Sequence, residues 1–132
     1  MALDETRRER DYLYGRLLAV ADRLEQVAMY KADKKDVRAT NAVRLMAAFT
    51  VKPYKTWGIL YQQLQPYINQ LNGAGYYQSL IDEVMDKFDA KEYENNAPLS
   101  PLYLLGFSAQ RRIFNYKNNQ ENLEDNENDT TE

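Results

Sequence analysis

The residue types that carry most enzyme chemistry are sparse in this sequence. It contains 0 Cys and 0 His, which excludes thiol nucleophiles, His-based general bases and zinc sites built from Cys or His. Three carboxylates, Asp82, Glu83 and Asp86, take neighbouring positions on a predicted helix and could hold a hard cation. No matching carboxylates recur on another predicted helix, so we expect a solvated face. The sequence therefore predicts no metal site and no cofactor.

Hydroxyl groups offer no better candidates for catalysis. Ser79, Ser100, Ser108 and Thr40 stand in no strained elbow or glycine-rich loop, and no His is present to activate them. Ser100 precedes Pro101, a pair that is typical of a helix N-cap followed by the first helical position. We therefore expect no catalytic residues and a protein that is not an enzyme.

The basic side chains carry the more informative pattern. Several gather where helices are expected to begin, and unpaired N–H groups at a helix N-terminus, with Lys and Arg nearby, suit a phosphate. The competing interpretation is a solubilising surface, because Asp33 and Asp36 stand among these cations. The candidate nucleic-acid-binding residues are Lys34, Lys35, Arg38, Arg44, Lys52, Lys55, Arg111 and Arg112.

Charge is distributed unevenly along the 132 residues. The formal net charge is -3, yet residues 1–60 hold 12 basic and 8 acidic side chains, whereas residues 121–132 hold 6 acidic and no basic ones. The body without that end is positively charged, so overall acidity does not argue against nucleic-acid binding. We expect residues 118–132 to be a disordered acidic tail and residues 1–117 to be one domain.

Apolar spacings of 3 and 4 residues predict five helices and no strand. Asp33 or Asp36 is the expected N-cap of the second helix, Pro66 is expected to kink or break the third near residues 62–66, and residues 89–99 are expected to be a loop. Short connections favour a single, mostly antiparallel, all-α bundle. The expected helices span residues 3–31, 36–50, 53–71, 76–88 and 101–116.

Three stretches resemble sequence motifs of one known family. Residues 12–20 (YLYGRLLAV) resemble its YxLGRLxAVLE helix, and residues 37–42 (VRATNA) resemble its xRATxx segment, followed by Pro53 and Trp57. Residues 102–111 (LYLLGFSAQR) resemble its closing FLLGYxxQR motif. The family is the C-terminal region of the large subunit of the type I-C CRISPR Cascade complex, the Csd1 family. The same region is also made as a separate small subunit, which this chain resembles in length and in motif placement.

The resemblance implies a non-catalytic helical subunit of a CRISPR-RNA-guided surveillance complex. The lack of Cys and of any apolar run near 20 residues separately predicts a cytoplasmic protein with no membrane contact. Implied partners are the backbone subunits, the large subunit, other copies of itself and target DNA, whose displaced strand it would hold to stabilise the R-loop. Guide RNA would supply sequence specificity, so scattered cations would suffice for this binding. The alternative is a purely structural module that bridges subunits without touching DNA.

Overall fold

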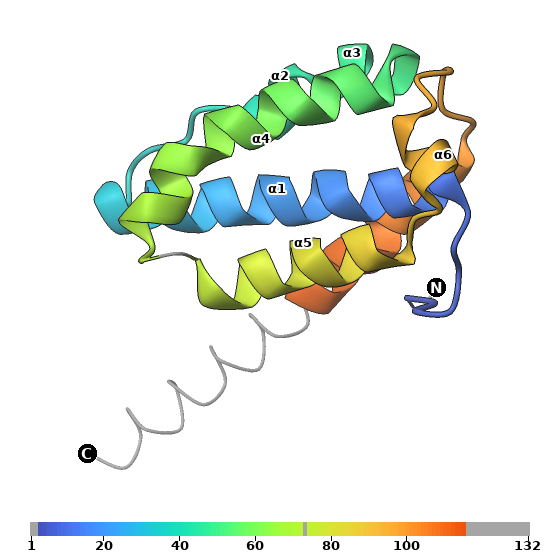
Figure 1. Ribbon diagram of the computed structural model, residues 1–132. Coiled ribbons are helices and arrows are strands. Elements are labelled where there is room, and N and C mark those ends of the chain that lie inside the picture. The colour runs from blue at the N-terminus through green and yellow to red at the C-terminus, as the bar shows by residue number, and fades with distance from the viewer. Residues whose placement is uncertain (1–2, 73, 116–132) are drawn as a thin grey trace.

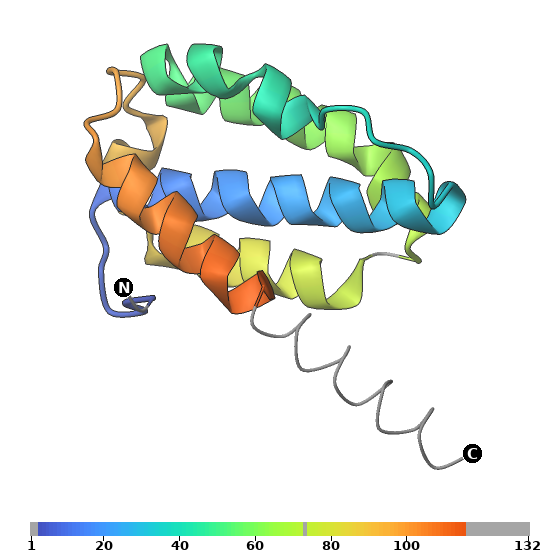
Figure 2. The same ribbon diagram turned by 180° about the vertical axis from the view of Figure 1, so that it is seen from behind.

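A single long helix forms the centre of the computed structural model, which describes residues 3–72 and 74–115 (Figure 1). The second, third and fourth helices lie on one side of it, and the fifth and last helices lie on the other. Figure 2 shows the last helix crossing both the central and the fifth helix. The helices are α1 (Arg10–Ala32), α2 (Asn41–Arg44), α3 (Met46–Val51), α4 (Pro53–Gln70), α5 (Gly75–Lys87), α6 (Ala90–Glu94) and a last helix over residues 102–115.

The N-terminal half of α1 is buried on all sides. Every residue from Tyr12 to Asp22 is buried, as expected for a helix that neighbours enclose completely rather than along one stripe. The neighbours contribute Phe49 from α3, Trp57 from α4 and Ile81 from α5 to the same apolar core. Burial of α1 therefore holds the two sides of the molecule together.

Successive helical segments alternate in direction along the chain (Figures 1 and 2). The α2–α3 segment runs back along α1, α4 reverses it, and α5 and the last helix reverse again. The all-α bundle with mostly antiparallel neighbours is thus confirmed, and the described residues contain no strand. None of the helices in the described ranges is long and apolar enough to cross a membrane.

The helix expected over residues 36–50 was predicted wrongly. The chain stays non-helical to Thr40, and Leu45, with φ -91° and ψ 0°, separates α2 from α3. The reason is local chemistry, because Asp33 and Asp36 accept hydrogen bonds from the backbone N–H groups of residues 35 and 38 instead of capping a helix. Thr40 is the N-cap, and its hydroxyl oxygen accepts from the N–H of Val43 at 3.2 Å.

Other boundaries differ less. The first helix begins at Arg10 rather than at residue 3, and the expected loop over residues 89–99 contains α6, capped by Asp89. Pro66 lies within α4 without interrupting it, although the ribbon bends toward the end of α1 over the last turns of α4 (Figure 1). The predicted acidic tail over residues 118–132 lies outside the described residues.

Candidate nucleic-acid interface

The connection between α1 and α2 presents cations on two consecutive turns. The carboxylate of Asp33 accepts from the N–H of Lys35 at 2.9 Å, and that of Asp36 accepts from the N–H of Arg38 at 3.1 Å. Such Asx turns use the acidic side chain to fold its own loop. The side chains of Lys34 and Lys35 are exposed, so the loop displays positive charge while its carboxylates face the backbone.

Two buried carboxylates of α1 anchor the far end of this loop. The Thr40 hydroxyl donates to Asp22, and Asn41 donates to Glu25 through its backbone N–H and, at 2.8 Å, through its side-chain amide. Burial raises the pKa of Glu25, and the hydrogen bond from the Asn41 N–H opposes that rise. The backbone N–H of Asn41 at the start of α2 is therefore satisfied by the protein itself, and an incoming phosphate would meet side chains.

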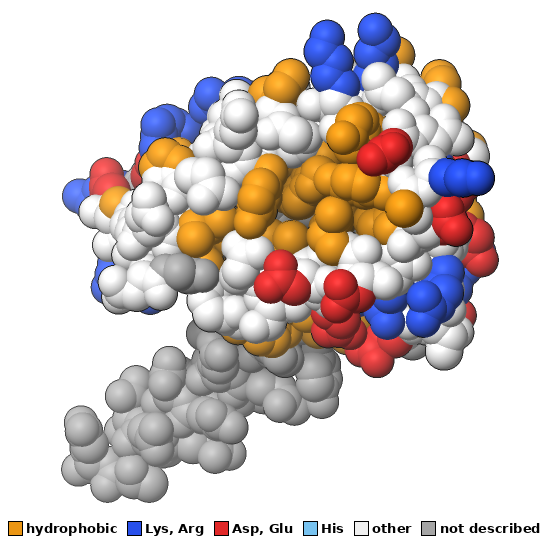
Figure 3. All heavy atoms as spheres, viewed as in Figure 1, with side chains coloured by type: hydrophobic (Ala, Val, Ile, Leu, Met, Phe, Trp, Pro, Cys, Tyr) orange, Lys and Arg blue, Asp and Glu red, His pale blue; other side chains and the backbone are white. Residues whose placement is uncertain are grey.

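Arg38 lies farther along the same loop, and Arg44 lies on α2. Arg38 forms an ion pair with Asp36 at 2.8 Å, which raises the pKa of the guanidinium, yet its side chain remains 63% exposed. Both arginines interact electrostatically with Glu25 and Tyr67, so both lie near the Glu25 carboxylate that holds the start of α2. We call Lys34, Lys35, Arg38 and Arg44 the basic end. In Figure 3, blue side chains gather at the left of the molecule, where α1 ends.

The other predicted cations lie elsewhere. Lys52 and Lys55 flank the start of α4, which lies at the opposite end of a helix about 27 Å long from the basic end. The N–H of Lys55 already donates to the side chain of Asn96 at 3.2 Å. Arg111 and Arg112 are exposed on the last helix, on the other side of α1. The structure thus brings four of the eight predicted residues together and separates the two remaining pairs.

Exposed apolar side chains accompany the basic end, although apolar residues at helical spacing are usually expected to face a core. Tyr30 is 59% exposed, Val37 93% and Val43 48%. The Nζ atom of Lys34 lies 6.0 Å from the centroid of the Tyr30 ring. The sequence signal is clearest at Val37, which stands between the charged residues Asp36 and Arg38.

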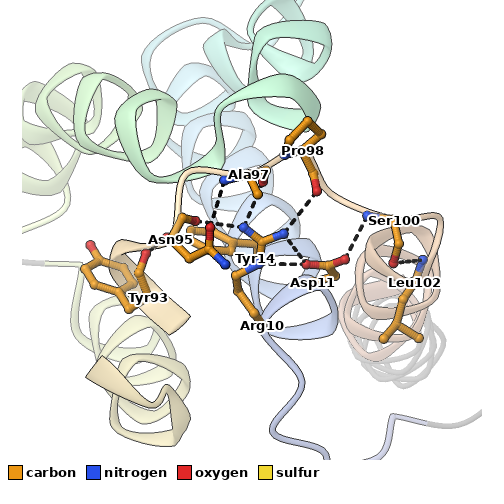
Figure 4. Close-up of polar contacts among 9 residues, drawn as sticks. All are labelled: Arg10, Asp11, Tyr14, Tyr93, Asn95, Ala97, Pro98, Ser100 and Leu102. Carbon is orange, nitrogen blue, oxygen red and sulfur yellow. Dashed lines mark hydrogen bonds and ion pairs between the residues drawn. The ribbon is translucent and has the colours of Figure 1, made fainter. Parts of the chain in front are cut away.

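A polar clamp at the start of α1 fixes the opposite end of the molecule (Figure 4). The guanidinium of Arg10 donates to the carbonyl oxygens of Asn95, Ala97 and Pro98 at 2.7, 2.8 and 3.1 Å. It also pairs with Asp11 at 2.8 Å, and Asp11 accepts from the N–H of Ser100 at 2.7 Å. Nothing in the sequence indicated this clamp, which positions the non-helical connection over residues 95–100 that leads into the last helix.

Two glycines from distant motifs let α1 and the last helix touch backbone to backbone. A Cβ atom on Gly15 would lie 2.0 Å from the carbonyl oxygen of Tyr103, and one on Gly106 would lie 2.1 Å from that of Tyr12. Beside this crossing, Nε of the buried Arg16 donates to Gln110 at 2.9 Å, and burial lowers the pKa of Arg16. The motif residues around positions 15 and 106 therefore serve packing.

The carboxylates of α5 do not assemble into a site. Asp82, Glu83 and Asp86 are all exposed, and Asp82 accepts from the side chain of Gln78 at 3.0 Å. Among residues 3–72 and 74–115, no three metal-ligating side chains converge. Of the hydroxyl candidates, Ser100 accepts from the N–H of residue 102 at 3.3 Å, a capping role like that of Thr40.

Residues 1–115 match the family of CRISPR-associated proteins designated Cas_Csd1. The match includes the central helix, the basic end and the last helix to its final described residue. No curated protein matches the sequence.

Proposed function

We propose that this chain, which belongs to the Csd1 family of CRISPR-associated proteins, acts as the small subunit of a type I-C CRISPR-RNA-guided complex. In this role it packs on the backbone and large subunits and holds the displaced non-target strand through its sugar-phosphate chain. It catalyses no reaction, which agrees with a sequence of 0 Cys and 0 His.

The observation that carries this proposal is the basic end. Four cations lie on one short loop and the helix that follows it. Asp22 and Glu25 of α1 hold that segment in place by accepting hydrogen bonds from its residues 40 and 41. Flexible cations on an anchored backbone suit a single strand, whose phosphates can adjust to them and whose sequence need not be read. The carboxylate of Asp36 offsets part of the positive field of Arg38, so we expect Lys34, Lys35 and Arg44 to contribute most of the attraction.

A second candidate function, a module that bridges subunits without touching DNA, has one specific observation in its favour. Figure 3 shows a continuous apolar area across the face between α4 and α5. Contact between these two helices includes the Tyr61 hydroxyl of α4, which donates to Gln78 of α5 at 3.2 Å. An area of this kind typically marks contact with another protein. It is compatible with packing in the complex, and it leaves the basic end unexplained.

The test uses the assembled complex. Reversing three charges (Lys34→Glu, Lys35→Glu and Arg38→Glu) should weaken R-loop formation and expose the displaced strand to nuclease while the bundle stays folded. The matched control is Lys87→Glu with Lys91→Glu, on α5 and α6, which should leave both readouts unchanged.

Salt dependence separates the two candidate functions. Contact with about four phosphates predicts that a plot of log K against log salt has a slope near -3 for single-stranded DNA. The triple variant loses three of these contacts, so its slope should be shallower by about 2. A flat salt dependence, or an R-loop that the triple variant forms normally, would favour the bridging module instead.

A further inference from the structure

Tyr30 is an exposed aromatic ring set among cations. It lies in the last turns of α1 and is 59% exposed, and the ammonium group of Lys34 lies 6.0 Å from its ring centroid. Arg23 and Val27 precede it at spacings of 7 and 3, so they share its side of the helix. No ring of another residue in the described ranges packs on Tyr30, so no protein ring takes the place that a ligand would need.

Phosphate binding alone does not account for this ring. Cations suffice to neutralise phosphates, whereas an exposed aromatic surface beside them offers a flat face on which a nucleobase can stack. Val37, at 93% exposure, adds a further apolar contact in the same segment. In a duplex the bases are already stacked and paired, so only an unpaired strand can use such a platform.

We propose that Tyr30 stacks against bases of the strand whose phosphates the basic end contacts, so that this surface prefers single-stranded to double-stranded DNA. The proposal rests on the proposed function, since it assigns a second kind of contact to the same site. Lys34 would hold a phosphate next to the stacked base, and its own contact with the ring would give way to the base.

The experiment measures binding of the full chain to three fluorescent probes. They are an oligothymidine of about 15 nucleotides, within the size range of known single-strand sites, a duplex of the same length, and a strand of the same length with abasic sugars. Tyr30→Leu should weaken binding of the oligothymidine about fivefold or more, the lower end of a base–aromatic stack. Binding of the abasic strand should not change, and Tyr30→Phe should keep the wild-type affinity.

A control variant, Tyr54→Leu, removes another exposed ring, 40% exposed at the start of α4, and should leave binding unchanged. If Tyr30→Leu binds oligothymidine as well as the wild type while loss of Lys34, Lys35 and Arg38 weakens binding, the stacking proposal is wrong and the proposed function stands. If the charge variants also bind normally, both are wrong. Equal weakening by Tyr30→Leu on the abasic strand would likewise overturn stacking, because that strand has no bases.

Discussion

Replacing Gly106 with Ala tests how α1 and the last helix are joined. The new Cβ atom would lie 2.1 Å from the carbonyl oxygen of Tyr12, and real Cβ atoms essentially never approach a neighbour within 3.0 Å. The helices would have to separate by about 0.9 Å, the difference between these distances. A shift of that size along the Arg16–Gln110 hydrogen bond would stretch it from 2.9 Å to about 3.8 Å, beyond hydrogen-bonding distance.

The free energy of unfolding should fall by about 2–4 kcal/mol. Overpacking costs about 1–3 kcal/mol and a buried polar group left without its partner costs a further 1–3 kcal/mol, whereas the better helix propensity of Ala returns up to about 1 kcal/mol. Circular dichroism during heating should show a midpoint lower by roughly 10 °C.

Gly58→Ala is the matched control for this prediction. Gly58 lies within α4, and a Cβ atom there would meet nothing within 4 Å, so this variant should be more stable by about 0.5–1 kcal/mol. If Gly106→Ala proved as stable as the wild type, or gained stability as Gly58→Ala should, the close crossing of the two helices would be refuted.

Three further predictions concern polar groups. Arg10→Met should lower the free energy of unfolding by about 2–4 kcal/mol in urea titrations, because three carbonyl oxygens and a carboxylate lose their donor; an unchanged midpoint would contradict the clamp. The raised pKa of Glu25 means that the folded state binds more protons than the unfolded state just above pH 4.5, the ordinary value. That contribution makes stability fall as pH rises through this window, and Glu25→Gln should remove the fall, so parallel pH profiles would contradict it. Asp36→Asn should strengthen binding of single-stranded DNA about twofold or more in fluorescence titrations, because Arg38 loses its ion-pair partner; weaker binding would count against Arg38 as a phosphate contact.

Strong local periodicity accounts for what the sequence predicted well. The apolar spacing over residues 76–88 predicted α5 to within one residue, because one stripe faces the core and polar residues cover the rest. Pro53 correctly marked the start of α4, since its fixed φ suits the first helical position. The all-α class followed from such segments without any long-range contact.

The errors arose where side-chain hydrogen bonds, two of them local and others tertiary, override helix propensity. Residues 36–39 carry helix-compatible side chains, yet Asp33 and Asp36 fold them into turns and the carboxylates of α1 hold Thr40 and Asn41. Helical spacing alone gives no sign of those partners, which stand 16 and 18 residues away in the chain.

The sequence grouped cations that the fold separates, and DNA binding by any of them stays a prediction. Charge near helix starts identified Lys34 and Lys35 correctly as exposed cations, but it also grouped them with Lys52 and Lys55, which α4 carries to the other end of the molecule. The crossing of Gly15 with the last helix joins residues about 90 positions apart, so only the folded topology could show it.

The most direct test of the basic end leaves its charges in place. A photo-crosslinking amino acid replaces Val37, which is 93% exposed between the cations, in the assembled guide-RNA-loaded complex bound to target DNA. The same substitution at Ile59 of α4, 42% exposed, serves as the control. Illumination should join position 37, and not position 59, to the displaced strand. A complex with a complete R-loop in which position 37 crosslinks only to protein, or to nothing, would contradict the proposal that this end of the molecule holds DNA.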